Sequence, residues 1–280
     1  MHLKILRLFL LTFWLFPSLL KAQKITGKII SLNTQKPIPY ARIGIPNTAI
    51  GSSADKEGAY QIRIPVSTSR QYLTIEAGGY ESLTMAADSF VQADRHNIAL
   101  REKIHELENV VVKSDNYTNK HWGIESKSKS VSISISNKEA FLDSSKEFAI
   151  AFTNKKRIKL LKININTIGY KDDDTLLLGY DIYSMKNGLP DTSILSINLT
   201  DTLTKDKLTD GTFSFDVEDK KIWINKQNFF VSVRVLNLDG GSLYMSGALL
   251  KKFYYRNFFE EWHKISLAAP ALNIEVKVPK

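Results

Sequence analysis

Hydrophobic and polar residues alternate in short runs along the first third of the chain. Alternation with a period of two is typical of a β-strand, because successive side chains point to opposite faces. Turn formers separate the runs, as at residues 55–58 (DKEG), where the aspartate can bond to its own backbone and the glycine accepts a positive φ. The runs span residues 24–32, 41–45, 50–54, 60–64, 72–76, 81–85, 96–100 and 107–112. About seven strands predict a small Greek-key β-sandwich over residues 23–113.

A second series of alternating runs follows a polar segment. Residues 114–130 are rich in Asn, Ser and Lys and predict an interdomain linker. Alternation then resumes at residues 131–135, 148–152, 158–165, 176–183, 194–199, 212–217, 222–224, 229–236, 243–249 and 274–278. Roughly nine strands with one apolar face predict a second β-sandwich, of the jelly-roll type, over residues 131–280. The predicted fold class is therefore all-β, with two consecutive sandwiches.

Residues 1–22 have the three-part pattern of a secretory signal peptide. They contain a basic start, an apolar run at residues 8–20 and the small residue Ala22 before a polar segment. The apolar run is shorter than the ~20 residues that a membrane-spanning helix needs. We therefore expect export through the inner membrane with cleavage after Ala22; an uncleaved anchor is the alternative. No later run is long enough to predict a transmembrane span in the mature chain.

The composition of the chain excludes several kinds of functional site. The 280 residues include no cysteine and carry a formal net charge of +9. Disulfides, thiol nucleophiles and cysteine metal ligands are therefore excluded. The basic residues are scattered and no nucleic-acid reader motif accompanies them, so we expect no nucleic-acid binding.

Five motifs follow one another in the first predicted sandwich. They are ITGKI (25–29), KPIPYA (36–41), ADKEGAY (54–60), AGGY (77–80) and LENVVV (107–112). This succession resembles the carboxypeptidase regulatory-like domain, a transthyretin-like β-sandwich of gram-negative envelope proteins that also occurs at the front of TonB-dependent outer-membrane transporters. The resemblance implies an accessory module without peptidase machinery.

A looser resemblance covers part of the second half. It rests on LLGYDIY (177–183), NGLP (187–190) and NFFVSV (228–233). These motifs are similar to a C-terminal sandwich that often follows the first domain in exported proteins. The resemblance implies an architecture and no activity.

The family name invites a search for a zinc carboxypeptidase. His105 and Glu108 form an H-x-x-E motif, and His263 is a candidate third ligand. Alternation would put His105 and Glu108 on opposite faces of one strand, and the chain lacks the helices of an α/β peptidase. No G-x-S-x-G motif is present, and the five histidines lack partner spacing. We therefore assign no catalytic, cofactor-binding or metal-binding residue.

Two further segments carry candidate chemistry. Residues 172–174 (DDD) offer carboxylates that Ca²⁺ prefers, although one loop cannot supply a full shell of six or more oxygens. The charged tip of a hairpin explains the same residues, and this is the interpretation that we favour. Residues 253–262 (FYYRNFFEEW) are rich in aromatics, which could stack on sugar rings or fill a partner interface. Burial in the core is the reading that we favour.

These observations favour an exported, non-catalytic cell-envelope protein, found in the periplasm, at the outer membrane or secreted. Its expected role is that of a protein- or glycan-binding or assembly module. Two alternatives stay open, namely a metal-dependent, carboxypeptidase-like peptidase and an accessory partner of a TonB-dependent outer-membrane transporter. The sequence predicts no cofactor and does not indicate an oligomeric state.

Overall fold

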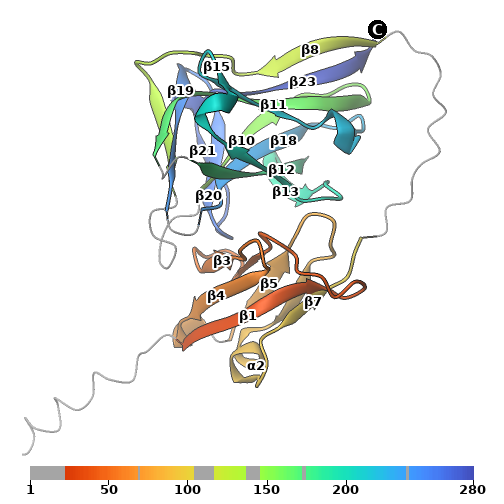
Figure 1. Ribbon diagram of the computed structural model, residues 1–280, viewed down its shortest axis with the longest axis vertical. Helices are drawn as coiled ribbons and strands as arrows, with labels where there is room; N and C mark the ends of the chain where they lie inside the picture. Colours follow the sequence, from red (N-terminus) through yellow and green to blue (C-terminus); the bar gives the residue numbers. More distant parts are fainter. Residues whose placement is uncertain (1–22, 69, 104–116, 137–145, 172–174, 238–239) are drawn as a thin grey trace, which may run out of the picture.

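The computed structural model describes residues 23–68, 70–103, 117–136, 146–171, 175–237 and 240–280. The fold is all-β, as predicted, and its helices are short. Figure 1 shows two bodies of strands, with the earlier residues in the lower body. Each body has a hydrophobic core of its own. We call residues 23–103 the first sandwich and residues 117–280 the second sandwich.

The first sandwich consists of two small sheets and a short helix. Its elements are β1 (Gln23–Ser31), β2 (Arg42–Gly44), β3 (Gly51–Ser53), β4 (Ala59–Ile64), the 3₁₀ turn η1 (Val66–Thr68), β5 (Tyr72–Glu76), β6 (Leu83–Ala86), α2 (Ala87–Gln92) and β7 (Ile98–Leu100). One sheet has the order β4-β1-β7 and the other the order β3-β2-β5-β6. Ile29, Ile43 and Ile75 are fully buried in the core that both sheets share. This architecture confirms the predicted sandwich.

The second sandwich is larger. Its elements are β8 (Tyr117–Gly123), β9 (Ser132–Ser136), β10 (Lys146–Phe152), β11 (Ile158–Lys171), β12 (Leu176–Lys186), β13 (Leu189–Ser193), β14 (Leu199–Leu203), η2 (Lys205–Lys207), β15 (Leu208–Thr209), β16 (Thr212–Asp216), η3 (Glu218–Lys220), β17 (Trp223–Ile224), β18 (Phe229–Val235), β19 (Ser242–Leu249), β20 (Phe253–Asn257), β21 (His263–Ile265), β22 (Ala268–Pro270) and β23 (Leu272–Pro279).

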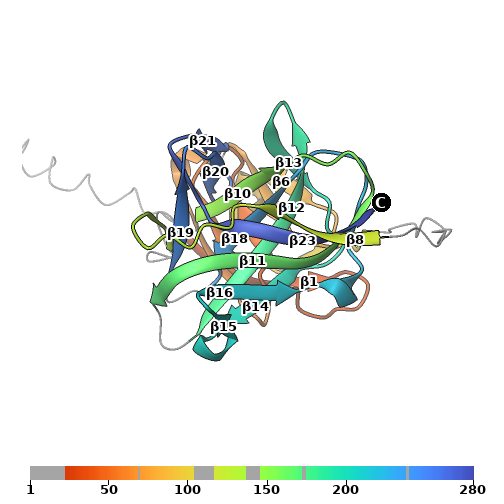
Figure 2. The ribbon, with the colours of Figure 1, turned by 90° about the horizontal axis from the view of Figure 1, so that it is seen from above.

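Two sheets enclose the core of the second sandwich. The seven-stranded sheet has the order β13-β12-β18-β10-β20-β21, with β14 paired to β12, and we call it the junction sheet because it faces the first sandwich. In the nine-stranded sheet, β11 pairs with β16, β17, β19 and β23. Figure 2 shows β8, β23 and β11 running side by side across this second sheet.

β18, in the middle of the junction sheet, is buried on both faces, because the first sandwich covers the face that points away from the core. Every residue of β18 is buried. Phe229 and Val231 point into the core of the second sandwich. Ser232 and Arg234 have the opposite parity along the strand, so they point toward the first sandwich. This second buried face holds the polar groups described below.

Three expectations need correction. Residues 117–123, expected in the linker, form β8, which pairs with β23 along its whole length. Most of its side chains are exposed or half-buried, so its sequence lacks an apolar alternation. The strand expected at residues 194–199 is instead two strands on either side of that segment, β13 and β14. About nine strands were expected, whereas the described residues of the second sandwich form sixteen, because several short or polar strands lack a period-two signal.

Some expectations lie outside the described residues. They include the signal peptide at residues 1–22 and the last strand of the first sandwich at residues 107–112. Within the described part of the chain, no helix is both long and apolar enough to cross a membrane.

Candidate functional site

A row of charged side chains crosses the junction sheet. Strand pairing places Gly179 of β12 opposite Arg234 of β18, Arg234 opposite Glu147 of β10, and Glu147 opposite Arg256 of β20. Side chains opposite each other on neighbouring strands lie on the same face. Two arginines therefore flank one glutamate. A Cβ at Gly179, at the end of the row, would lie 2.9 Å from Leu236 Cδ1 and 3.3 Å from Arg234 Nε, so the glycine lets both side chains pack against β12.

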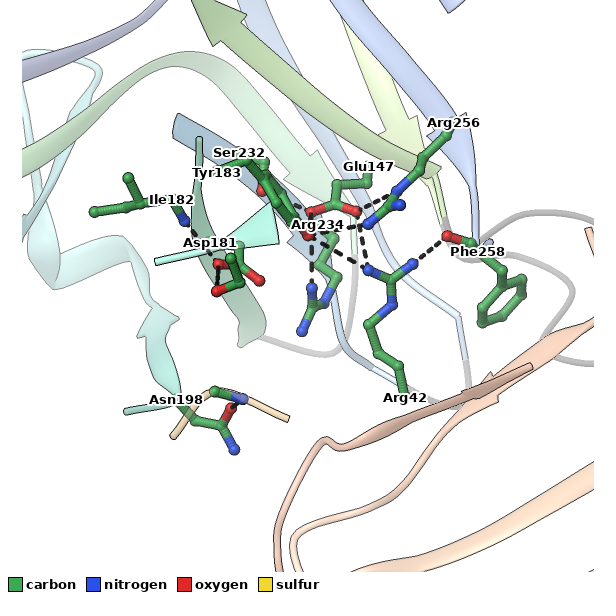
Figure 3. A network of polar contacts seen from close by, with 12 residues as sticks. Arg42, Glu147, Asp181, Ile182, Tyr183, Asn198, Ser232, Arg234, Arg256 and Phe258 are labelled. Atoms are coloured by element: carbon green, nitrogen blue, oxygen red, sulfur yellow. Dashed lines mark hydrogen bonds and ion pairs between the residues drawn. The ribbon is translucent and has the colours of Figure 1, made fainter. Parts of the chain in front are cut away.

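Glu147 is the centre of the row, and its side chain is 1% exposed. Its Oε1 accepts hydrogen bonds from Ser232 Oγ at 2.6 Å and Tyr183 Oη at 2.9 Å. Its Oε2 accepts from Arg256 Nε at 2.9 Å and from Arg42 Nη1 at 3.2 Å. Figure 3 shows these side chains converging on the carboxylate. A buried carboxylate needs such partners, because it has lost its hydration.

The arginines control the protonation of Glu147. Burial alone would raise the pKa of its carboxyl group, but the fields of Arg256, Arg42 and Arg234 outweigh burial and hold that pKa well below its ordinary value of 4.5. Burial would lower the pKa of the Arg256 guanidinium, but the negative charge of Glu147 outweighs burial and raises that pKa. Burial and the charge of Arg256 lower the pKa of Arg42. At neutral pH the group is one anion among three cations, and we call Arg42, Glu147, Arg234 and Arg256 the charge cluster.

Arg42 is the contribution of the first sandwich to the charge cluster. It lies on β2, and its side chain is 6% exposed. Besides its bond to Glu147, its Nη2 donates to the carbonyl oxygen of Phe258. Its Cζ lies 4.8 Å from the centre of the Phe259 ring, a distance typical of a cation–π contact. One side chain therefore crosses from the first sandwich into the second and is held there on several sides.

The aromatic pair Phe258 and Phe259 packs on glycines of the first sandwich. A Cβ at Gly44 would lie 2.3 Å from the Phe259 ring, and a Cβ at Gly51 would lie 2.9 Å from Phe258. Only glycine leaves the space for these rings at the present separation. The backbone N–H of Asn47 donates to the carbonyl oxygen of Phe259 at 2.9 Å. We call this region the aromatic contact.

A second contact joins the two sandwiches through amide groups. The side-chain carbonyl of Asn198 accepts the backbone N–H of Gly78 at 2.7 Å, and its amide donates to the carbonyl oxygen of Pro39 at 3.0 Å. A Cβ at Gly78 would lie 2.4 Å from the carbonyl oxygen of Ile197. The loops therefore approach backbone to backbone. We call this region the amide contact.

A cavity of about 220 Å³ lies at the junction, with walls from both sandwiches. The residues that matter for its chemistry are Arg42, Glu76, Asp181, Ser193, Asn198 and Arg234. Arg42 of the charge cluster and Asn198 of the amide contact both line it, so the docking of the two sandwiches forms the cavity. We call it the junction cavity.

Arg234 lines this cavity, and two of its nitrogens are buried without a hydrogen-bond partner. The residue is 9% exposed. Its Nη1 lies 3.8 Å from Glu147 Oε1, which is an ion pair but not a hydrogen bond. Its Nε and Nη1 are buried and have no hydrogen-bond partner. Buried donors are nearly always paired, and an unpaired one costs free energy.

Asp181 also lines the cavity, and the charge of Arg234 acts on it. Its Oδ1 accepts from Ser193 Oγ at 2.6 Å and from the backbone N–H of Ile182 at 2.8 Å. Burial raises the pKa of its carboxyl group, and repulsion from Glu147 raises it further. Arg234 and the two hydrogen bonds oppose this rise without cancelling it. Asp181 is therefore a half-buried acid that takes up a proton more readily than an exposed aspartate.

The first sandwich has a family match. Residues 25–112 match the family model of the CarboxypepD_reg-like domain. The first sandwich is a CarboxypepD_reg-like domain. This confirms the resemblance of its motifs, and the domain is a regulatory, non-catalytic β-sandwich module. Comparison of the chain with curated proteins and with solved structures gave no match.

The residues considered for metal binding do not come together in the described structure. His105 and Glu108, at the end of the CarboxypepD_reg-like domain, lie outside the described residues, as do residues 172–174. His263 is exposed on β21, and its ring centre lies 5.2 Å from that of Tyr255. Among the described residues, no three His, Asp or Glu side chains are placed to share a metal ion.

The aromatic segment at residues 253–262 is mainly buried, which confirms the favoured interpretation. Phe253 lies in the core of the second sandwich, while Tyr254 packs in a smaller cluster on the other face. Phe258 and Phe259 are buried against the CarboxypepD_reg-like domain. The interface that these two rings fill is thus within the chain.

The sequence interpretation missed the charge cluster, although a signal existed. Arg42 interrupts the apolar run at residues 41–45, and Arg234 interrupts the run at residues 229–236. A charge within a strand that is otherwise buried needs a partner. The partners could not be named, because Glu147 and Arg42 are 105 positions apart in the chain.

A shallower hollow lies on the outer face of the nine-stranded sheet. It is lined by amides and charges that include Asn164, Asn273 and Glu275. Asn164 Nδ2 donates to Asn273 Oδ1 at 3.0 Å, and Asn273 Nδ2 donates to the carbonyl oxygen of Ile124. These buried amides already satisfy one another. The junction cavity, which residues of both sandwiches line, is the stronger candidate site.

Proposed function

We propose that this protein is an exported, non-catalytic protein of the cell envelope that binds a ligand at the junction cavity. Its destination after export is the periplasm, the outer membrane or the medium. One observation carries the proposal: docking of the CarboxypepD_reg-like domain on the second sandwich forms a cavity with fixed polar walls. Ligand sites occur preferentially at such boundaries between domains.

Binding suits the chemistry of the cavity better than catalysis does. A general base must hold a proton near the operating pH and be free to accept one. The arginines keep Glu147 ionised, and four donors occupy its two oxygens. The described lining of the cavity includes no histidine that could act as a base for a nucleophile. Fixed donors and acceptors of this kind orient a ligand without transforming it.

Export is tested by following the N-terminus. The full chain with a C-terminal tag is produced in a gram-negative host, and the tagged protein from each cell fraction is sequenced from its N-terminus. We expect an envelope protein that begins at Gln23, because Ala22 precedes the cleavage point. A chain with Leu10→Arg and Leu11→Arg in the apolar run should stay unprocessed in the cytoplasm. An unmodified chain that remains cytoplasmic and full length contradicts the proposal.

Binding at the junction is tested with a variant that fills the cavity mouth. Thr192 is exposed and lines the junction cavity, whereas Thr209 is exposed on β15 and does not line it. Protein purified from the envelope is applied to an array of envelope glycans, together with Thr192→Trp and the control Thr209→Trp. We expect Thr192→Trp to weaken binding at least tenfold and Thr209→Trp to leave it unchanged. Equal binding by both variants would place the ligand elsewhere and refute the proposed site.

A further inference from the structure

Two neighbouring turns of the second sandwich expose leucines. Leu249, Leu250 and Leu267 are 62%, 84% and 73% exposed. Pairing of β19 with β22 places Leu249 opposite Ala268. The backbone N–H of Leu250 donates to the carbonyl oxygen of Leu267 at 2.8 Å, so the two turns lie side by side. Ile265, two residues before Leu267, is 36% exposed. We call Leu249, Leu250, Ile265 and Leu267 the apolar patch.

Neither the core nor the turn requires a leucine at position 250. The φ of Leu250 is 57°, in the left-handed region, which glycine and asparagine adopt more readily than leucine does. Its side chain is the most exposed of the large apolar side chains among the described residues. The residue therefore costs conformational free energy and gains no burial within the chain. A strained and exposed apolar residue points to a contact outside the chain.

Lysines accompany the apolar patch. Lys251, Lys252 and Lys264 lie in the same two segments of the chain, and all three are exposed. These segments, residues 249–252 and 264–267, contain no Asp or Glu. The surface thus combines exposed aliphatic side chains with three positive charges.

The acids of neighbouring segments are directed elsewhere. Glu125 lines the shallow hollow on the nine-stranded sheet together with Lys127 and Lys162. Glu260 accepts a hydrogen bond from Asn257 at 2.8 Å, at the end of β20 that meets the first sandwich. The apolar patch lies at the opposite end of β20, because the turn at residues 249–252 directly precedes that strand.

This combination suits a membrane surface better than a protein partner. The buried centres of protein interfaces are enriched in aromatic residues, methionine and arginine, and protein interfaces are depleted of lysine. Four apolar side chains are also too few for a stable protein interface, which takes about 20–30 residues from each partner. At the boundary of a bilayer, in contrast, aliphatic side chains enter the apolar layer while lysines reach the phosphates of anionic lipids.

We infer that the apolar patch and its lysines attach this protein to the surface of an anionic phospholipid bilayer. The leucines enter the boundary between headgroups and acyl chains, and Lys251, Lys252 and Lys264 contact lipid phosphates. The inference goes beyond the proposed function, because attachment at this end of the second sandwich does not involve the junction cavity.

The test measures co-sedimentation of the purified protein with phospholipid vesicles. We expect binding to an equal mixture of phosphatidylglycerol and phosphatidylcholine to be at least tenfold tighter than binding to phosphatidylcholine alone. Leu250→Asn introduces a residue that accepts the positive φ, so the variant should fold and bind the mixture at least tenfold more weakly. Leu32→Asn, at a leucine of the first sandwich that is 46% exposed, is the control and should bind like the unmodified protein.

Two further measurements locate the contact. Because the chain contains no cysteine, Leu267→Cys and the control Leu32→Cys can each be labelled with a fluorophore whose emission shifts to the blue in an apolar layer. We expect that shift on anionic vesicles for Leu267→Cys alone. Replacing Lys251 and Lys252 together by glutamine should weaken binding to the mixture at least tenfold, whereas the same change at the exposed Lys36 and Lys226 should have little effect.

Each contrary outcome has a defined meaning. Equal binding to both kinds of vesicle, binding to neither, or unchanged binding by Leu250→Asn overturns the inference. Binding to native envelope membranes but not to protein-free vesicles overturns it in favour of a protein partner. A dimer that Leu250→Asn dissociates in sedimentation velocity overturns it in favour of a second copy of this chain. Thr192→Trp should bind vesicles like the unmodified protein, so loss of glycan binding at the junction cavity and loss of vesicle binding are separate results, and each refutes its own proposal.

Discussion

Both carboxylate oxygens of Glu147 are occupied by donors, and these donors come from both sandwiches. Its energetic role follows from this arrangement. Replacing a whole buried ion pair by apolar groups is often harmless, whereas removing one partner leaves an uncompensated buried charge. Glu147 compensates three arginines at once, so its removal is the most damaging single change in the charge cluster.

Glu147→Gln should therefore destabilise the protein strongly. The amide keeps the size of the side chain but leaves Arg42, Arg234 and Arg256 buried without their anion. We expect a loss of about 3–5 kcal/mol in the free energy of unfolding, measured by urea denaturation. Glu261→Gln, at an exposed position, is the control and should stay within about 0.5 kcal/mol of the unmodified protein. A change of similar size for Glu147→Gln would show that the charge cluster contributes little to the free energy of unfolding.

The same carboxylate predicts a loss of stability in acid. The folded state lowers the pKa of Glu147 below its ordinary value of 4.5, so its contribution is present above that pH and is lost as the pH falls further. Asp181 acts with the opposite sign, because its raised pKa makes the folded state take up a proton above 3.8. Urea midpoints between pH 7 and pH 2 should thus fall more steeply below pH 4.5 in the unmodified protein than in Glu147→Gln. Parallel curves would contradict this assignment.

At the scale of strands, sequence pattern succeeded where one face is buried and failed elsewhere. The alternating run at residues 148–152 correctly predicted part of β10, since its apolar residues face the core. β8 was not predicted, because it is largely exposed and its sequence shows no alternation of apolar residues. The row from Arg234 through Glu147 to Arg256 depends on strand order, which joins positions 87 or more apart. Local periodicity carries no information on such pairing, so the site could be suspected from charges in apolar runs but not assembled.

The amide contact yields a prediction about a loop. Gly78→Ala adds a Cβ that would lie 2.4 Å from the carbonyl oxygen of Ile197, and backbone cannot move aside as easily as a side chain. We expect the two loops to separate, with faster hydrogen exchange of the Gly78 region and loss of the bond to Asn198. The control is Ser196→Ala, an exposed side chain of the facing loop, which should exchange like the unmodified protein. Unchanged exchange in Gly78→Ala would mean that this contact is not tight in solution.

For the whole molecule, the question is whether the two sandwiches behave as one unit. Their described contacts are Arg42 in the charge cluster, the aromatic contact and the amide contact. Interfaces between domains of one chain are usually small and polar, and relative motion is then the default. A buried ion pair that crosses the boundary opposes such motion, because separation would expose the apolar surroundings and leave charges without partners. The junction cavity exists only while the sandwiches stay docked.

A double-mutant cycle measures how strongly this link couples the two sandwiches. Arg42→Ala, Glu147→Gln and the double variant are compared with the unmodified protein, and Arg70→Ala is the control for loss of an exposed arginine from the first sandwich. Because Arg42 and Glu147 share one hydrogen bond and one network, we expect an interaction energy of about 1–3 kcal/mol. The pair Lys162 and Glu275, which lies within the second sandwich at 3.8 Å with a partly exposed lysine, should give less than about 1 kcal/mol. Additive effects of Arg42→Ala and Glu147→Gln would mean that this ion pair does not couple the sandwiches, and the walls of the cavity would then be held by the aromatic contact and the amide contact alone.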